Sequence, residues 1–560
     1  MPEFEPPGPG RWTRDTGRFP RQASPVMASL LPAAALRGFR AATRPYGLLL
    51  DHVAWAFVDG WAYMAPRRIA ALQDHEVADH AAWQRLVQSS AYLRRRLAVS
   101  DRVFERRVWL EELARWHGSD KPAMAAANRA AARVDPEALD DGELLAHLAT
   151  CRTNLRQALH LHHLYDVTPA VAVGDLLANL AAWTGAPAFS FLNLLNRGPR
   201  SVLRAQELHT LAQAIALQPG AVAALEHGLG SRFVVDWLRS LGGSAAPAVE
   251  RCLDVVGWWI AGPVCDVDEP CILEVPEILA DSLRAAVARS GGEGEGDGKM
   301  PDSAGAVRSA LPARTRRAFD LMLEDAKAVQ WVRDERALYC DVWATGVLRR
   351  GLLAAGRRLA DAGRLEDPAD VLETQRGELR ALFSRGRGGL RDDLALRARR
   401  RRAADPASVP AVLGAGAWSP IKLDWLPPGA ARTERAFRTF LAAMDDEPPA
   451  SVPGGLSGLA ASPGVREGRA RVITRLTDLP ALDREDVLVA GAASPSLIVL
   501  LPLVGAVVTD RGGLLSHAAI VARELGVPAV VGTGDATNRI PDGARVRVDG
   551  SAGVVTVLTG

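Results

Sequence analysis

One histidine of this sequence stands among neighbours suited to chemistry on a phosphate group. His517 follows Ser516 and the pair Gly512 and Gly513, at the start of a segment of helical composition. The apolar, β-branched run at 506–509 predicts a buried strand that ends before the glycines. Glycine lets a backbone approach a bulky group without Cβ clashes, and serine is a favourable helix N-cap. The sequence therefore predicts a strand, a glycine turn and a short helix with His517 in its first turn.

That placement gives the imidazole specific properties. The free N–H groups and the positive dipole end at a helix start favour a phosphate, so Gly512, Gly513 and Ser516 are predicted to bind one. The same field disfavours an imidazolium, which predicts a neutral His517 with a nucleophilic ring nitrogen. A neutral imidazole can accept a phosphoryl group covalently and pass it on. The alternative is an ordinary surface histidine at a helix start.

Glycine and proline residues after His517 predict where the helix ends and where the next strand begins. Gly526 is expected to close the helix in a left-handed conformation, Pro528 prevents its continuation, and the next strand is expected from 529 to 531. These alternating elements predict an α/β domain at this end of the chain.

The motif around His517 resembles a known family. The run 512–532, together with 461–468, 486–489 and 549–555, is similar to the phosphohistidine swivelling domain of the PEP-utilising enzymes. This resemblance implies that His517 carries the phosphoryl group. Several members have threonine before the Ser-His pair, and Leu515 at that position is similar to the rifampicin-phosphotransferase branch.

Length, composition and charge limit the classes of protein to which this chain could belong. A chain of 560 residues suggests two to four domains, and a hydrophobic content of 48% is ample for their cores. The net charge of +2 gives no electrostatic case for binding nucleic acid or a membrane surface. Five cysteines without a CxxC pair indicate neither a disulfide framework nor a zinc site, so a cytoplasmic protein is expected.

Taken in order, the chain is expected to have four parts. Residues 1–29 read as a disordered tail, and 30–405 as a helical substrate or acceptor domain with a flexible insertion at 290–309. Residues 406–455 read as a Pro/Gly-rich hinge linker before the swivelling domain at 456–560. The predicted fold is multidomain α and α/β: a large α-helical domain followed by a β/β/α phosphohistidine domain.

Two groups in the helical region are candidate substrate-binding residues. His160 and His163 are one turn apart and share a helix face, but no carboxylate or thiolate stands nearby at ligand spacing, so no metal site is predicted. Trp258 and Trp259 lie in a Gly/Pro-dense segment that resembles the central helical domain of rifampicin-phosphotransferase-like proteins. The alternatives are structural histidines and core aromatics.

Arginines supply the other candidates. The segment 326–336 resembles the helical domain of the same branch, in which the Arg and Lys of an Arg-Glu-Tyr-Pro-Lys segment serve catalysis. Arg333 matches that Arg, and the Lys position falls on Ala337. A guanidinium here could steady a transferring phosphoryl group, or form a surface ion pair. The run Arg399–Arg402 is interpreted as a solvated helix end.

The resemblance also raises the question of the phosphoryl donor. Family members that use ATP carry an ATP-grasp domain, and those that use PEP carry a following (β/α)₈ barrel; neither is recognised in these 560 residues. ATP and Mg²⁺ are therefore expected on a partner ATP-grasp protein. The predicted function is a phosphotransferase component that delivers the phosphoryl group to a hydroxyl of a bulky, apolar small molecule. The alternatives are a dehydratase that phosphorylates and then eliminates in natural-product biosynthesis, and a non-enzymatic phospho-carrier or regulatory protein.

Overall fold

The computed structural model divides the chain into two compact units. It describes residues 4–73, 77–196, 206–218, 220–228, 230–262, 264–291, 303–384, 389–416, 419–444, 455–473, 482–492 and 500–558. Unit 1 comprises Met1–Asn179, Asp266–Asp268 and Glu324–Leu441. Unit 2 comprises Leu180–Cys265, Glu269–Leu323 and Ala442–Gly560.

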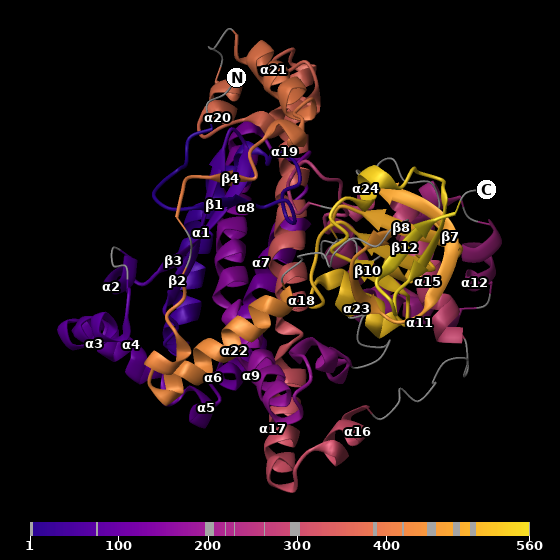
Figure 1. The fold of residues 1–560 in the computed structure, drawn as a ribbon. Coiled ribbons are helices and arrows are strands. Elements are labelled where there is room, and N and C mark those ends of the chain that lie inside the picture. Colours follow the sequence, from indigo (N-terminus) through magenta and orange to yellow (C-terminus); the bar gives the residue numbers. More distant parts are fainter. Residues whose placement is uncertain are drawn as a thin grey trace. The chain divides into compact units, whose positions relative to one another are not determined.

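Unit 1 is mostly helical and carries one small sheet (Figure 1). Three helices, α9, α17 and α22, contribute residues to both units. The helices and strands with residues in unit 1 are β1 (Trp12–Arg14), α1 (Pro25–Thr43), β2 (Leu50–Val58), β3 (Trp61–Arg68), α2 (Ala70–Gln73), α3 (His80–Ser89), α4 (Ala91–Ser100), α5 (Val103–Arg106), α6 (Val108–Arg115), α7 (Lys121–Arg133), α8 (Asp141–Leu164), α9 (Val167–Thr184), α17 (Ala313–Val329), α18 (Val332–Arg336), the π-helical η9 (Ala337–Val342), α19 (Trp343–Asp361), the 3-10 helix η10 (Pro368–Glu373), α20 (Glu378–Phe383), α21 (Leu390–Arg402), β4 (Val412–Leu413) and α22 (Pro428–Met444).

Helices α1 and α8 form the centre of unit 1, and α19 packs on α8 (Figure 1). Ser24 caps α1 by accepting a hydrogen bond from Met27 N, and Pro25 occupies its first turn. Gly38 lets the two helices meet, because a Cβ there would lie 2.5 Å from the His160 carbonyl oxygen and 2.7 Å from His163 Cβ. This close approach fixes the histidine-bearing end of α8 against α1.

The small sheet contradicts two predictions. It places strands inside the region predicted to be helical, 30–405, and inside the predicted disordered tail, 1–29. Strands β2 and β3 form an antiparallel hairpin whose turn residues Asp59 and Gly60 both have positive φ angles, 47° and 77°. Such an Asp-Gly pair is a strong hairpin signal that the helical periodicity obscured. Strand β1 pairs with β3 and β4, and Trp12 is 5% exposed. The prediction of a disordered tail is therefore wrong for the described residues 4–29.

The predicted hinge is also partly wrong. Strand β4 pairs with β1, and α22 buries Ala436, Phe437 and Phe440. A Cβ on Gly174 would lie 1.9 Å from the Ala436 carbonyl oxygen, so α22 is packed tightly on α9. Residues 406–441 thus belong to unit 1, and 445–454 lie outside the described residues.

Unit 2 contains a set of helices and the α/β domain that carries His517. The predicted insertion at 290–309 is helical at both ends, because α15 runs to Gly291 and α16 begins at Ser303; residues 292–302 lie outside the described ones. The remaining elements are α11 (Gln206–Ala216), α12 (Ala221–Ala223), α13 (Val234–Ser240), α14 (Ala246–Val255), the 3-10 helix η7 (Val256–Trp258), α15 (Pro276–Gly291), α16 (Ser303–Ala310), β5 (Leu456–Ser457), β6 (Leu459–Ser462), β7 (Val465–Ile473), β8 (Asp486–Ala490), β9 (Ala506–Thr509), α23 (His517–Leu525), β10 (Ala529–Val531), α24 (Ala536–Arg539), β11 (Arg545–Asp549) and β12 (Val554–Val557).

The strands of the α/β domain form one eight-stranded sheet in the order β5-β12-β11-β7-β8-β9-β10-β6 (yellow in Figure 1). Strands β7, β8, β9 and β10 run parallel to one another, and β11 and β6 flank them in antiparallel orientation. Buried apolar side chains from these strands and from α24 form its core. The predicted fold class is confirmed: a large helical region precedes a sheet-rich α/β domain.

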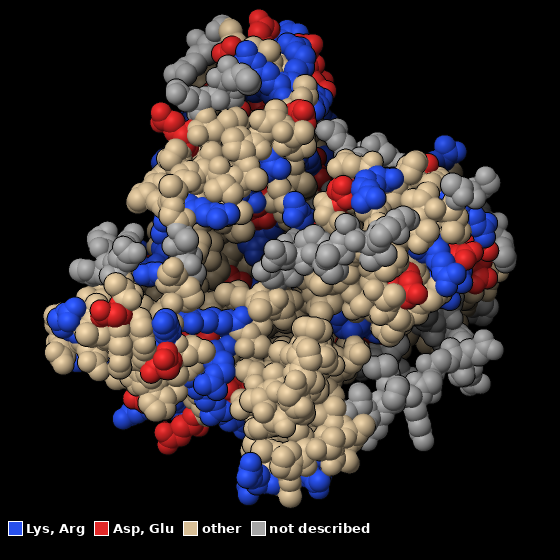
Figure 2. Space-filling view, in the orientation of Figure 1, with Lys and Arg blue, Asp and Glu red and all other residues tan. Residues whose placement is uncertain are grey.

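Within the described residues, one continuous stretch of helix is long and apolar enough to meet the criteria for a membrane span. It is Asp141–Thr184, formed by α8 and α9, and its most apolar window has a mean hydropathy of 1.2. Of that window, 67% is buried inside the fold, which is characteristic of a core helix. Over the described residues of the face in Figure 2, side chains of both charges are interspersed.

Candidate functional site

The loop after β9 positions His517. Strand β9 lies inside the parallel part of the sheet, and its four residues are all buried. In a parallel sheet, the loops at the carboxyl ends of the strands are the usual place for ligands. Ser516 N-caps α23 by accepting a hydrogen bond from Ala519 N at 3.3 Å, and Gly526 ends the helix with a φ of 66°. The predicted strand, cap and helix end are confirmed.

Glycine is required at one of the two loop positions. Gly512 has a φ of 119°, and a Cβ there would lie 3.0 Å from both Cβ and Oγ of Ser516. Gly513 has no positive φ; its carbonyl accepts a hydrogen bond from Ser516 N at 2.9 Å. The turn therefore brings Gly512 against the serine that starts the helix.

A buried carboxylate anchors the start of this loop. Asp510 is 8% exposed and accepts hydrogen bonds from the N–H and the hydroxyl of Thr537 at the start of α24. Burial raises the pKa of Asp510, and the bonds from Thr537 oppose that rise. The Asp510 carbonyl also accepts from Gly534 N at 2.8 Å. These contacts attach the start of the loop to the segment that contains Gly534 and Thr537.

His517 is the first residue of α23 and is half-buried. Its Nδ1 atom is inaccessible to solvent. Its neighbours Ala518 and Ala519 are buried on the sheet side of the helix. The structure thus offers an imidazole at the positive end of a helix that follows a glycine turn.

The candidates from the helical region are divided between the units. Arg333, His160 and His163 belong to unit 1, whereas Trp258 and Trp259 belong to unit 2 with His517.

Arg333 lies on α18 and is half-buried. Burial lowers its pKa to about 10, with Asp334 opposing and Arg336 adding to the effect. The guanidinium remains charged at neutral pH.

His163 is almost wholly buried at the end of α8. Its Nδ1 is 2.7 Å from Asp166 Oδ2, and its ring stacks on Phe39 with centroids 5.1 Å apart. Burial lowers the pKa of His163 to about 4, although Asp166 opposes that change. The interpretation that no carboxylate stands at ligand spacing is therefore wrong, because Asp166 follows His163 by three residues.

His160 is less involved in this cluster than its neighbour. Burial and Arg37 lower the pKa of the half-buried His160. The ring of His162, by contrast, lies 4.9 Å from that of His163 and its Nδ1 is 2.6 Å from Asp341 Oδ2. Sequence reasoning did not select His162 or Asp341, because helical spacing alone does not show which side chains of η9 and α18 meet the end of α8.

Arg336 is a further residue that sequence reasoning missed. It is 5% exposed, pairs with Asp166 and donates to the carbonyl oxygen of His162. The position expected to carry a lysine is Ala337, and Arg336 supplies a cation one residue earlier. The signal was present in the charged run Arg333–Arg336.

Of the two tryptophans, Trp259 is a core residue at 4% exposure, and its backbone bonds with Ile272 N. Trp258 is half-buried at the end of η7 and retains accessible surface. Burial of Trp259 favours the core alternative for that residue, whereas Trp258 stays a candidate contact.

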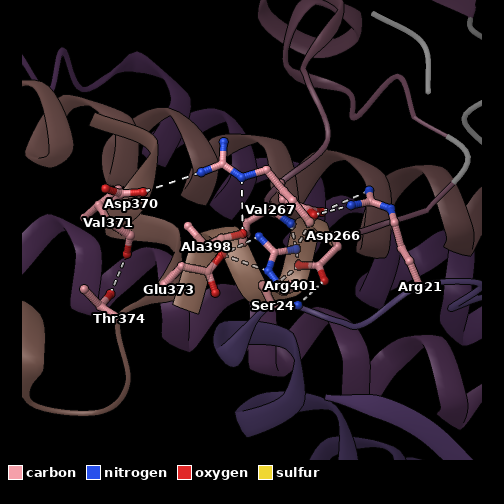
Figure 3. A network of polar contacts seen from close by, with 12 residues as sticks. Arg21, Ser24, Asp266, Val267, Asp370, Val371, Glu373, Thr374, Ala398 and Arg401 are labelled. Atoms are coloured by element: carbon pink, nitrogen blue, oxygen red, sulfur yellow. Dashed lines mark hydrogen bonds and ion pairs between the residues drawn. The ribbon is translucent and has the colours of Figure 1, made fainter. Parts of the chain in front are cut away.

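An ion-pair network joins residues 266–268 to the rest of unit 1 (Figure 3). Asp266 accepts from Ser24 N at 2.7 Å, and burial beside Asp268 raises the pKa of Asp266 to about 6. Arg401 pairs with Asp268 and with Glu373, whose Oε1 lies 2.6 Å from its Nη2.

Arg21 adds a second guanidinium to Asp268. Arg401 is only 14% exposed as a side chain, so the interpretation of the arginine run as a solvated helix end is wrong for this residue.

Comparison with known proteins assigns the α/β domain. Residues 482–553 match the family described as PEP-utilising enzyme, mobile domain. The matched segment includes β8, the glycine turn and the whole of α23. The segment that contains His517 is therefore similar to the mobile domain of the PEP-utilising enzymes.

The similarity to individual relatives covers different shares of this chain. The chain is 54% identical over 101 residues to a chondramide synthase of Chondromyces crocatus, covering 18% of this chain and 3% of that protein. It is 50% identical over 99 residues to the phosphoenolpyruvate synthase of Aeropyrum pernix, covering 18% and 12%. With a rifampicin phosphotransferase of Streptomyces sviceus it shares 31% identity over 363 residues, covering 62% of this chain and 39% of that protein.

The chain therefore spans well under half the length of each of these relatives. A solution NMR structure of an Enzyme I protein is similar at 16% identity, over 65% of this chain and 82% of that one, with a TM-score of 0.15.

Proposed function

We propose that this protein is a phosphotransferase component in which His517 carries a phosphoryl group and delivers it to a hydroxyl of a bulky small molecule. The observation that carries the proposal is the position of His517, after a glycine turn and at the start of a capped helix. In this proposal the helix N-terminus stabilises a bound phosphoryl group, and Nε2 of the imidazole is the nucleophile.

Delivery requires a second site, and unit 1 supplies suitable groups. Arg333 and Arg336 lie one turn apart on α18, and both are positively charged beside the acidic and imidazole groups at the end of α8. Fixed guanidinium groups stabilise the negative charge of a transferring phosphoryl group. In this proposal, His517 is charged at one place and discharged near α18 after a movement of the domain that carries it.

The phosphoryl group would come from ATP and Mg²⁺ held by an ATP-grasp protein. Phosphoryl transfer depends mainly on positioning and on charge neutralisation by metal ions, which a donor site has to provide. The two sheets of the described residues are the four-stranded sheet of unit 1 and the sheet around His517. Neither contains a glycine-rich phosphate loop with a lysine, and we place the donor site outside these 560 residues.

Labelling tests this proposal directly. The purified protein is incubated with Mg²⁺ and β- or γ-labelled ATP, or with labelled PEP, with and without the candidate ATP-grasp protein. We expect label only with the partner, in an acid-labile and base-stable linkage that is lost in His517→Ala. A chain that labels itself would refute the separate donor, and a label retained in His517→Ala would refute the carrier.

A further inference from the structure

Four metal-ligating side chains gather where α8 ends in unit 1. One donor atom from each of His162, His163 and Asp166 lies within 4.8 Å of the other two. Asp341 on η9 adds a fourth, because its Oδ2 is 2.6 Å from His162 Nδ1. We propose that these four residues bind one divalent transition-metal ion, independently of the function proposed above.

The closest contact within the group is not arranged as a hydrogen bond. His162 Nδ1 is buried and, despite its 2.6 Å separation from Asp341, has no hydrogen-bond partner of suitable geometry among the described residues. Oδ1 of Asp341 is likewise buried and unsatisfied. Leaving such atoms unsatisfied is costly, and a cation that accepts both lone pairs removes that cost.

Surrounding residues hold the ligands in place. Arg336 pairs with Asp166 Oδ1, so that Oδ2 is directed to His163 Nδ1 at 2.7 Å. Arg336 also donates to the carbonyl oxygen of His162. On the other side, Phe39 stacks on His163. Hydrogen bonds to the ligands from a second layer of residues are a regular feature of protein metal sites.

Burial and charge agree with a cation. The four side chains are 12%, 2%, 13% and 18% exposed, for His162, His163, Asp166 and Asp341 respectively. Two carboxylates neutralise a divalent ion, and the carbonyl end of α8 adds negative dipole potential. The nearby positive charges of Arg336 and Arg333 are partly offset by Asp334, which is 8% exposed.

The donor set selects the class of ion. Two imidazoles with two carboxylates suit Zn²⁺, Mn²⁺ or Fe²⁺, whereas Mg²⁺ and Ca²⁺ prefer oxygen ligands alone. The site is therefore distinct from the Mg²⁺ that a nucleotide donor site requires. It would place a Lewis acid close to Arg333, which stands one turn before Arg336 on α18.

Metal binding is measured on the full chain, freed of any histidine tag and stripped with a chelator. Zn²⁺ and Mn²⁺ are titrated separately by calorimetry against a competing chelator. His162→Gln and Asp341→Asn are the test variants because they remove one imidazole from α8 and one carboxylate from η9. His147→Gln, on the same helix, and His517→Ala are the controls, and circular dichroism verifies the fold of each protein.

We expect one equivalent of Zn²⁺ or Mn²⁺ to bind to the wild type and to both controls, with release of protons. Each test variant should bind at least roughly 10–100-fold more weakly, since even second-layer substitutions cost that much. Binding that is unchanged in the folded variants His162→Gln and Asp341→Asn would overturn the proposal, as would a wild type that binds neither metal. In the latter case the residues serve as structural His–Asp contacts within the core of unit 1.

Discussion

Replacing Arg401 by methionine should strongly destabilise unit 1, although the residue belongs to a run of four arginines. Its guanidinium pairs with Asp268 and Glu373, whose side chains are 9% and 4% exposed. Methionine keeps the length of the aliphatic stem but removes both ion pairs. Two carboxylates then lose a partner in a poorly hydrated place, and Arg21 is the ion-pair partner that Asp268 retains among the described residues.

The size of the effect follows from burial. Breaking a buried pair by removing one partner costs about 3–5 kcal/mol. For a unit of about 300 residues, that corresponds to a fall in Tm of roughly 5–8 °C. Arg399→Met is the matched control: its side chain is 61% exposed and 3.9 Å from Glu366, so it should cost about 0–1 kcal/mol.

The effect also depends on pH. Burial would raise the pKa of Asp268, but Arg21 and Arg401 outweigh it and hold that pKa below its ordinary value. A carboxyl whose pKa is depressed by folding stabilises the protein above its unfolded pKa, and this contribution is lost as the pH falls through the folded value. The difference between wild type and Arg401→Met should therefore be full near pH 7 and shrink in acid.

Urea denaturation followed by tryptophan fluorescence and far-UV circular dichroism measures these differences at several pH values. Equal midpoints for Arg401→Met and Arg399→Met would refute the reasoning, because they would show that the Asp268 network is as hydrated as a surface ion pair.

Further predictions concern the loop and helix around His517, Arg333, and the α1–α8 contact. Ser516→Ala should destabilise the α/β domain by about 1 kcal/mol through loss of the N-cap, measured by urea denaturation; an unchanged midpoint would contradict that role. Arg333→Met should leave charging of His517 intact but slow its discharge roughly 10²–10³-fold in single-turnover assays, and equal discharge rates would reduce Arg333 to a structural residue. Gly38→Val should cost about 1–3 kcal/mol or more, because its Cβ would meet the His160 carbonyl oxygen at 2.5 Å; full stability by thermal melting would disprove the close packing of α1 on α8.

The loop before His517 was predictable because its determinants are local. A β-branched run, a glycine with positive φ, a serine cap and a closing glycine act within 21 residues, 506–526, and each acts on its immediate neighbours. Sequence reasoning therefore placed β9, α23 and β10 correctly and put His517 at a helix start. The same local signals could have found the Asp59-Gly60 hairpin turn.

The tertiary structure alone decided the rest, because the relevant partners are distant in the chain. Strand β1 exists because Trp12 and Thr13 pair with Leu413 and Val412, and an isolated segment of three residues has no strand preference that could reveal this. In the sequence, nothing distinguishes Arg401 from the three other arginines of its run. In the folded protein, Arg401 is a buried cation because it pairs with Asp268 and Glu373, which are distant in the chain.

The cluster at the end of α8 has the same origin. His162 and Asp341 are 179 residues apart. Helical periodicity predicts which face of its own helix a side chain occupies, but not which other helix packs against that face. Local chemistry thus placed His517 at a helix start, whereas packing of separate helices created the buried polar site in unit 1, since electrostatic partners and low hydration arise only when those helices come together.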